Sequence, residues 1–345
     1  MKTAFVSGGS GFFGSILKRA LLERGWAVVN IDLVKDEDQH PQLYSIQGDI
    51  RDHPLLESAT KSETIDVIFH CAAILAHAVK DKNFLWSSNV DGTRSILNFA
   101  KDHHIPKIVF ISSNCLWGSA MGRPIREDDE PHPVEIYGRS KWEGEKILLS
   151  ERGLVSVTIL RCPTIIDAGR LGLLAILFEF IDEGRKVWTV GGGRNCYQFI
   201  YAGDLVDACV KAADHPDTEI FNVGSDGVQP LREVYQAVID KAHSSSRVAS
   251  LPQGPTLFLM KVMHALGLSP LGPYQYKMIA EDFLFDTSKI KRVLGWVPTL
   301  TNSEMLWQAY DFYRDHRSTL RSGDAVSAHR QPAKMGVIRL LKWLS

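Results

Sequence analysis

MKTAFVSGGSGFFG, from Met1 to Gly14, is the stretch that decides the fold. Thr3 to Ser7 is a short run without charge, which is typical of a strand buried on both faces of a parallel sheet. A helical pattern follows the glycines, so a helix N-terminus and its free N–H groups meet the strand's carboxyl end. The pyrophosphate of a dinucleotide can bind there. Gly8, Gly11 and Gly14 fall at G-x-x-G-x-x-G spacing. A tight turn alone would also need glycine, but the position of these glycines between a strand and a helix favours a dinucleotide site.

Length and composition limit the class of protein. The chain has 345 residues, which suggests about two domains, and it is 45% hydrophobic and 23% charged, as in a soluble globular protein. A net charge of −1 gives no overall field toward nucleic acid, so no nucleic-acid partner is expected. The five cysteines are scattered and form no C-x-x-C motif, and there is no signal-peptide pattern, which indicates a cytoplasmic protein. There is no apolar run of about 18 residues, so no membrane span is expected. The histidines lack ligand spacing, so no metal site is expected.

Strand and helix patterns alternate along the first half of the chain. Strands are predicted at 26–31, 43–47, 65–69, 107–111 and 155–160, with helices between them, which favours a Rossmann-type, doubly wound parallel sheet. The alternation then breaks after the strand at 155–160, so the second half of the chain is expected to be arranged differently. We predict a nucleotide-binding domain over 1–165 with returning segments near 195–225, a substrate domain mainly over 166–320, and a tail with an amphipathic helix over 321–345.

Two carboxylates are candidates for contacts with the adenosine half of the cofactor. Asp32 ends the second strand, where it can accept hydrogen bonds from ribose hydroxyls and would repel a 2′-phosphate. NAD is therefore predicted rather than NADP, although Lys35 lies close by in the sequence. Asp49 can meet the adenine amino group or can be an ordinary turn aspartate, while Asp52 is expected to cap the next helix.

Three residues have the chemistry of a proton-transfer site. Ser113 follows the predicted strand 107–111, at the sheet edge that lines a binding crevice. Tyr137 and Lys141 stand four residues apart and therefore share one face of a helix. A neighbouring ammonium favours the phenolate and lowers the tyrosine pKa, which would make Tyr137 a usable acid and base near neutral pH.

Together these segments resemble the extended short-chain dehydrogenases/reductases, also called the NAD-dependent epimerase/dehydratase family. The matching pieces, spread over roughly 1–313, are GGSGFFG, Asp32, GDIRD, HCAA, NVDGT, SSN, YGRSK and FDTSKIKRVLGWVP. The resemblance implies a Rossmann domain for NAD(P) and a smaller C-terminal α/β domain that closes over the substrate. It also implies Tyr137 as acid and base, Ser113 bonded to the reacting oxygen, and Lys141 on the nicotinamide ribose. The predicted cofactor-binding residues are Gly8, Gly11, Phe12, Phe13, Gly14, Asp32, Asp49, Ile50, Cys71, Ala72, Ala73, Asn89, Tyr137, Lys141, Pro163 and Thr164.

Departures from the family pattern bear on the reaction. The family's sugar 4,6-dehydratases carry an Asp-Glu pair where this chain has Asn114 and Cys115, which argues against dehydration. Its nucleotide-sugar epimerases hold the diphosphate with an asparagine and an arginine, and Thr164 and Tyr197 stand nearest those positions. Substitutes for the missing groups are Arg170, Arg194 and Arg232.

Three functions compete on this evidence. The first is a dehydrogenase/reductase that moves a hydride at a ketone or secondary alcohol, and it is favoured because the diphosphate-holding residues are missing. The second is a nucleotide-sugar 4-epimerase with tightly bound NAD. The third is a non-catalytic NAD sensor, against which the intact Ser113, Tyr137 and Lys141 argue. Cys115 is read as core filling rather than as a covalent catalyst.

Two segments in the C-terminal quarter of the chain bear on whether the protein contacts a membrane or a lipid-linked substrate. Residues 330–345 combine an apolar stripe with four cations and no acid. This pattern fits a helix that lies in a membrane interface, and it equally fits a helix docked on its own protein or on a partner subunit. A homodimer is therefore left open. Met260, Met263, Leu266 and Leu268 are expected in the core, with an apolar pocket as the alternative. The substrate is therefore predicted to be a small or lipid-linked molecule, and peripheral contact with a membrane through the tail is a hypothesis.

Overall fold

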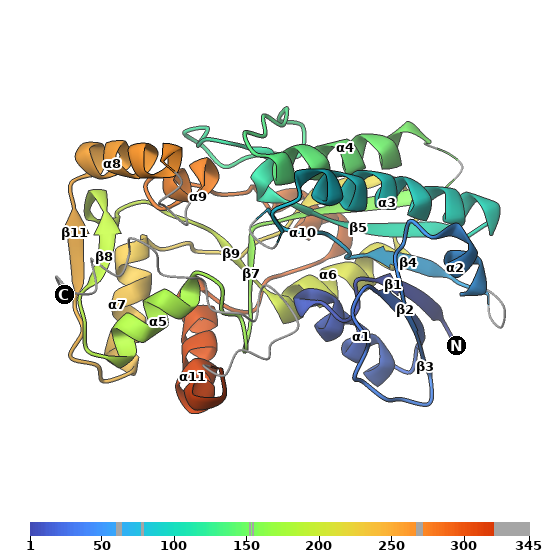
Figure 1. The fold of residues 1–345 in the computed structure, drawn as a ribbon, viewed down its shortest axis with the longest axis horizontal. Helices are drawn as coiled ribbons and strands as arrows, with labels where there is room; N and C mark the ends of the chain where they lie inside the picture. The colour runs from blue at the N-terminus through green and yellow to red at the C-terminus, as the bar shows by residue number, and fades with distance from the viewer. Residues whose placement is uncertain (60–63, 77–78, 152, 154, 267–271, 321–345) are drawn as a thin grey trace.

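The fold is known from a computed structural model that describes residues 1–320 except 60–63, 77–78, 152, 154 and 267–271. The predicted tail, 321–345, lies outside the described residues. Figure 1 shows a helix-covered sheet formed mainly by the first half of the chain and, beside it, a C-terminal part with short strands and several helices. None of the described helices combines the length and apolar character needed to cross a membrane.

A parallel sheet of seven strands forms the larger part of the molecule. Its order is β10-β6-β5-β4-β1-β2-β3, so successive strands leave β1 in one direction and continue from β4 in the other. The carboxyl ends of β1 and β4 therefore border the point where the winding reverses, which is where α/β sheets bind ligands. The strands are β1 (Thr3–Ser7), β2 (Ala27–Asp32), β3 (Leu43–Gln47), β4 (Val67–His70), β5 (Lys107–Ser113), β6 (Ser156–Cys162) and β10 (Glu219–Asn222).

Two hydrophobic clusters cover the faces of this sheet. Ala4 and Val6 point into one cluster with helices α1 and α6, while Phe5 points into the other with α3 and α4. All three side chains are fully buried, which explains the uninterrupted apolar run of β1. Asp52 caps α2 as expected, since its carboxylate accepts from Leu55 N at 3.3 Å. The helices are α1 (Phe12–Glu23), α2 (His53–Ser58), α3 (Lys82–Asp102), α4 (Ile136–Ser150), α6 (Ala202–Asp214) and α10 (Ser288–Leu294).

The C-terminal part has a core of its own, in which Phe178, Val234 and Tyr310 are buried. Two strand pairs, β7 with β9 and β8 with β11, and five helices surround it, with single 3₁₀ turns η1 and η2. Their bounds are β7 (Thr164–Ile166), β8 (Val187–Val190), β9 (Phe199–Tyr201), β11 (Val248–Leu251), α5 (Leu174–Asp182), α7 (Leu231–Lys241), α8 (Gln253–Ala265), α9 (Pro273–Met278), α11 (Asn302–Leu320), η1 (Asn114–Leu116) and η2 (Gly191–Gly193).

The predicted fold class is confirmed, and most predicted elements lie within a few residues of the observed ones. The third strand, Leu43–Gln47, has the predicted bounds. The expectation that Met260, Met263 and Leu266 belong to the core is wrong, because helix α8 has no buried residue, and Leu268 lies outside the described residues. The division near residue 165 stays a proposal, which the return of α6 and β10 to the large sheet supports.

Candidate active site

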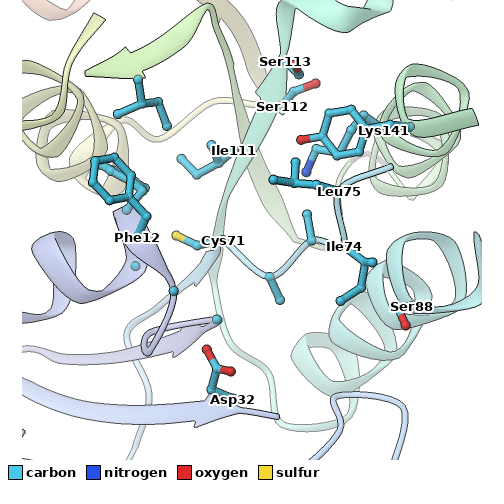
Figure 2. A pocket seen from close by; sticks show the side chains of 18 of the residues that line it. Phe12, Asp32, Cys71, Ile74, Leu75, Ser88, Ile111, Ser112, Ser113 and Lys141 are labelled. Atoms are coloured by element: carbon cyan, nitrogen blue, oxygen red, sulfur yellow. The ribbon is translucent and has the colours of Figure 1, made fainter. Parts of the chain in front are cut away.

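One cavity of about 390 Å³ runs along the carboxyl ends of the sheet strands. Figure 2 shows Asp32 at one end and Ser113 and Lys141 at the other, with Cys71 between them. The cavity therefore follows the direction in which a dinucleotide would extend from adenosine to nicotinamide. The predicted residues that line it are Gly8, Gly11, Phe12, Phe13, Gly14, Asp32, Asp49, Ile50, Cys71, Ala72, Ala73, Ser113, Tyr137, Lys141, Pro163 and Thr164.

The glycine turn is built so that backbone segments touch. Gly8 has a φ of +78°, and a Cβ atom on it would lie 2.7 Å from the backbone of Ala72. A Cβ atom on Gly14 would lie 2.0 Å from the carbonyl oxygen of Gly8, so helix α1 can start this close to β1 only with glycine there. No side chain caps α1, which leaves its first N–H groups for a ligand at the cavity. These features fit the pyrophosphate of NAD.

Asp32 is held by the glycine loop and by the chain that follows β2. Its Oδ2 accepts from Ser10 N at 2.9 Å and its Oδ1 accepts from Val34 N at 2.9 Å. Burial raises the pKa of Asp32, while these amide donors act in the opposite direction. The carboxylate is thus fixed at the wall of the cavity, whereas Lys35 is exposed and does not line it. At this wall the cavity therefore presents the carboxylate of Asp32 rather than the ammonium of Lys35.

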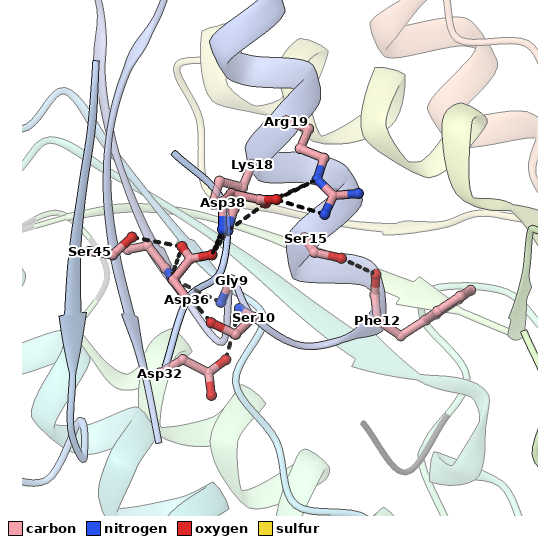
Figure 3. A network of polar contacts seen from close by, with 11 residues as sticks. Gly9, Ser10, Phe12, Ser15, Lys18, Arg19, Asp32, Asp36, Asp38 and Ser45 are labelled. Atoms are coloured by element: carbon pink, nitrogen blue, oxygen red, sulfur yellow. Dashed lines mark hydrogen bonds and ion pairs between the residues drawn. The ribbon is translucent and has the colours of Figure 1, made fainter. Parts of the chain in front are cut away.

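A second network fixes the loop after β2 (Figure 3). The buried Lys18 of α1 places its Nζ 2.5 Å from Asp36 and 2.9 Å from Asp38, and Arg19 also pairs with Asp38. Asn30 of β2 donates to Asp36 at 2.7 Å. Lys18 and Arg19 therefore bind the loop's own carboxylates, and the loop that follows Asp32 is tied to α1.

Replacing Asp32 by alanine is expected to narrow the preference for NADH over NADPH by roughly ten- to a hundredfold, because hydrogen bonds to a charged group contribute about 1.5–3 kcal/mol. Titration of each cofactor by fluorescence measures the ratio. Lys35→Ala is the matched control and should leave the ratio unchanged. A wild-type preference for NADPH would contradict the assignment of Asp32.

Asp49 and Asn89 have partners within the protein. Asp49 lines the cavity, but both its oxygens accept from the Arg51 guanidinium, at 2.9 and 2.5 Å. Asn89 does not line the cavity. It accepts from Ile74 N at 2.7 Å and donates to Ile74 O at 3.1 Å and to Ser140 Oγ at 2.9 Å. Asn89 therefore supports a cavity residue, Ile74, instead of facing the cofactor.

The reactive end joins β5 with α4. Lys141 is buried and its Nζ lies 4.0 Å from the centroid of the Phe110 ring. Burial lowers the pKa of Lys141 to about 8. Burial raises the pKa of Tyr137, and the two groups that most oppose this are the charge of Arg170 and a hydrogen bond with Ser113. The net shift of the Tyr137 pKa in the cofactor-free protein is therefore upward, because desolvation of the phenol outweighs the charge of Arg170 and the hydrogen bond with Ser113. The predicted lowering by Lys141 stays a prediction.

A buried ion pair holds α4 in place behind the reactive end. Glu145 lies one turn after Lys141, and its carboxylate accepts from Arg161 of β6 at 2.7 Å and from Ser112 of β5 at 2.5 Å. Both charged side chains are almost fully buried. Sequence reasoning missed this pair, although Glu145 stands four residues after Lys141 on the same helix face.

The cavity also contains three thiols. Burial raises the pKa of Cys71 and of Cys162 to about 12 and the pKa of Cys115 to about 11. A thiol with such a pKa is protonated near neutral pH and is a poor nucleophile. This supports the interpretation of Cys115 as packing rather than as a covalent catalyst.

Beyond Tyr137, a chain of hydroxyl groups closes the substrate end. Tyr197 Oη lies 2.9 Å from Thr164 Oγ1, accepts from Asn114 Nδ2 at 3.0 Å, and lies 3.4 Å from Tyr274 Oη. Tyr274 and Asn114 line the cavity, and neither was among the predicted site residues. Their contacts join segments more than 70 residues apart, which spacing along the chain does not reveal.

Arg170 brings a second cationic side chain, besides Lys141, to this end of the cavity. It lines the cavity, and its guanidinium carbon lies 5.5 Å from the centroid of the Phe12 ring. Burial lowers its pKa to about 10, so it is charged at neutral pH. Arg194 and Arg232, the other two candidates, do not line the cavity.

Comparison with known proteins identifies the family to which the chain belongs. The family model for the NAD dependent epimerase/dehydratase family matches residues 4–224. The uncharacterised protein y4nG of Sinorhizobium fredii is 37% identical over 99% of this chain and 86% of its own. The 4-hydroxy-2-methyl-3-oxo-4-farnesyl-3,4-dihydroquinoline-1-oxide ketoreductase of Stigmatella aurantiaca is 26% identical over 88% of this chain and 94% of its own. The UDP-glucose 4-epimerase of Thermotoga maritima, solved with UDP-glucose, has a TM-score of 0.75 at 22% identity and covers 91% of this chain and 99% of its own. The chain therefore belongs to the NAD-dependent epimerase/dehydratase family, as its resemblance to the extended short-chain dehydrogenases/reductases implied, and it is an enzyme that uses NAD.

Proposed function

We propose that this enzyme is a dehydrogenase/reductase that transfers a hydride between NAD and a ketone or secondary alcohol. Ser113, Tyr137 and Lys141 line one end of the cavity, and Asp32 lines the other. An acid/base group, an orienting hydroxyl and a ribose-binding ammonium are what such a transfer requires.

The contact between Thr164 and Tyr197 is the observation that carries the choice of reaction. These residues stand nearest the positions with which the family's epimerases hold a nucleotide diphosphate, and their side-chain oxygens lie 2.9 Å apart. Asn114 donates to the same tyrosine oxygen. The polar groups at both positions are thus bonded to each other, which leaves them poorly placed to grip a diphosphate and favours a substrate without one.

NAD supplies the hydride donor or acceptor when it is bound. In the reducing direction, Ser113 Oγ donates to the carbonyl oxygen and orients it. Tyr137 Oη gives its proton to that oxygen as the carbon gains the hydride, and the phenolate then regains a proton from solvent. Lys141 would hold the ribose of NAD, and the ion pair between Glu145 and Arg161 fixes α4, which carries both Tyr137 and Lys141. The oxidation of an alcohol runs through the same groups in reverse.

The substrate is proposed to be apolar or lipid-linked. Ile74, Leu75 and Ile165 line the cavity together with Tyr274. The name of the Stigmatella relative describes a ketone that carries a farnesyl chain, which is a precedent for such a substrate in a protein similar to this one. Peripheral membrane contact through 330–345 belongs to the same proposal, which for this segment is supported by the sequence alone.

A nucleotide-sugar 4-epimerase is the second candidate, and Arg170 is the observation that favours it. A guanidinium at the substrate end of the cavity can hold a phosphate or a carboxylate. An epimerase would use the same Tyr137 but would return the hydride to the sugar, so its NAD would be regenerated in each turnover.

The two candidates differ in their net redox change. We expect the purified enzyme to oxidise NADH in proportion to the ketone reduced when it is given a panel of cyclic and isoprenyl ketones, with no change of UDP-glucose or UDP-N-acetylglucosamine. Absorbance at the nicotinamide band and chromatography of the sugars measure both reactions. Formation of an epimer without net NADH consumption would overturn the reductase and establish the alternative.

A further inference from the structure

Helix α8 presents an apolar surface that the described part of the protein does not cover. Phe258 is 70% exposed, Leu259 59%, and Leu266, directly after the helix, 65%, while Val262 is 38% exposed. No residue of α8 is buried. Every other described helix carries at most one large exposed apolar side chain. A helix that is apolar on several sides is normally covered by protein or lipid.

The charges on this surface indicate what covers it. Residues 253–266 contain Lys261 and His264 and no aspartate or glutamate, although the chain as a whole has a net charge of −1. Contact between two copies of this surface about a twofold axis would bring Lys261 and its symmetry mate to the same patch, with no acid on either copy of α8 to pair them. The segment 330–345 is also basic, so its charge does not complement α8. An anionic lipid surface matches both the apolar side chains and the ammonium of Lys261.

The position of α8 connects this surface to the active site. In Figure 1, α8 lies at the periphery of the C-terminal part, next to α9. Tyr274 of α9 lines the cavity, and its backbone N–H donates to Glu135 Oε1 at 2.9 Å. Glu135 immediately precedes α4, which carries Tyr137. Gln253, at the start of α8, donates to Ala280 O at 3.3 Å, so α8 is tied to the segment that directly follows α9.

We propose that α8 docks the enzyme on an anionic bilayer and places the α9 side of the cavity next to the lipid from which its substrate comes. This proposal rests on the proposed function for the nature of the substrate, but the docking itself does not depend on it. Apolar side chains of α8 enter the boundary between headgroups and acyl chains, and Lys261 contacts the anionic headgroups. A ketone with a long apolar chain then reaches Tyr137 without leaving an apolar environment.

Co-sedimentation of the full chain with vesicles tests the docking. The vesicles contain phosphatidylcholine alone or phosphatidylcholine with phosphatidylglycerol. We expect binding to the anionic vesicles that weakens with salt. Phe258→Ser/Leu259→Ser should reduce this binding at least about tenfold, because two large apolar side chains leave the contact. The matched control is Val293→Ser/Val297→Ser, at residues that are 44% and 63% exposed on and after α10.

Three results would overturn the proposal. The first is equal sedimentation of the α8 variant and the wild type, and the second is a similar loss in the α10 control. The third is a wild-type dimer, measured by light scattering, that the α8 variant abolishes, since the surface would then join two copies of the chain. A variant without 330–345 separates the contribution of the tail.

Activity measurements keep this proposal distinct from the proposed function. The α8 variant should reduce a short, water-soluble ketone at the wild-type rate and should lose activity only on a ketone embedded in anionic vesicles. If the wild type reduces no ketone but still sediments with anionic vesicles through α8, the proposed function fails and the docking stands. If the α8 variant also loses activity on the soluble ketone, α8 supports the active site itself and the docking role is wrong.

Discussion

Replacing Tyr137 by phenylalanine is expected to lower kcat by roughly 10²–10⁴-fold, which is the usual contribution of a general acid or base. The change removes one oxygen and little volume, so α4 and its ion pair between Glu145 and Arg161 should stay intact. Binding of NADH should remain close to that of the wild type, because the glycine turn and Asp32 are not touched. Steady-state kinetics give kcat, and fluorescence titration gives the dissociation constant.

The same substitution at Tyr235 is the control. Tyr235 lies on α7 in the C-terminal part and packs against its core, and it does not line the cavity. Tyr235→Phe should keep the wild-type kcat. If Tyr137→Phe kept wild-type turnover, the proton would have to pass through another group, and the assignment of Tyr137 would be lost.

The parts of the site that the sequence predicted are those set by local spacing and by strand order. Gly8 and Gly14 must be glycine because a Cβ atom at either position would collide with backbone, so their spacing already contains the geometry of the turn. Asp32 and Ser113 end strands of one parallel sheet, which places both at the same edge. Tyr137 and Lys141 share a helix face. Each of these placements follows from one element or from the topology alone.

The parts that sequence reasoning missed depend on contacts between distant segments. Asn89 belongs to a matching motif, but its amide turns to Ile74 and Ser140, and only packing of α3 on α4 determines that. Likewise, Arg170 reaches the cavity from the loop between β7 and α5, and no pattern in the chain distinguishes it from Arg194. The pKa of Tyr137 is a third case, because the desolvation that raises it is a property of the folded cavity.

Helix α8 shows why apolar composition is not evidence of burial. Met260, Met263 and Leu266 were predicted as core residues, yet no residue of α8 is buried and Leu266 directly after it is 65% exposed. The sequence of the helix lacks the alternation of an apolar and a polar face that marks a helix packed on one side. That missing alternation was the signal for an unusual environment.

The second large effect is expected for Lys141→Met, which should weaken NADH binding by roughly 10- to 150-fold and lower kcat as well. Hydrogen bonds from a charged donor contribute about 1.5–3 kcal/mol, and the ammonium is proposed to donate to the ribose. Methionine keeps much of the length and apolar volume of the lysine stem, so the packing against Phe110 should survive. A loss of affinity would then report on the charge rather than on a cavity in the core.

The pH dependence of NADH binding separates that charge effect from a packing defect. Burial lowers the pKa of Lys141 to about 8 in the cofactor-free protein. Below that pH the ammonium is present and donates, and above it the free protein must first take up a proton, so wild-type affinity should fall as pH rises through about 8. Lys141→Met has no group to titrate there and should bind NADH with the same weakened affinity on both sides. Lys146→Met is the control on the same helix, since Lys146 is half-exposed and pairs with Glu143, and it should keep the wild-type pH dependence. A wild-type affinity that stays constant across this range would remove Lys141 from cofactor binding.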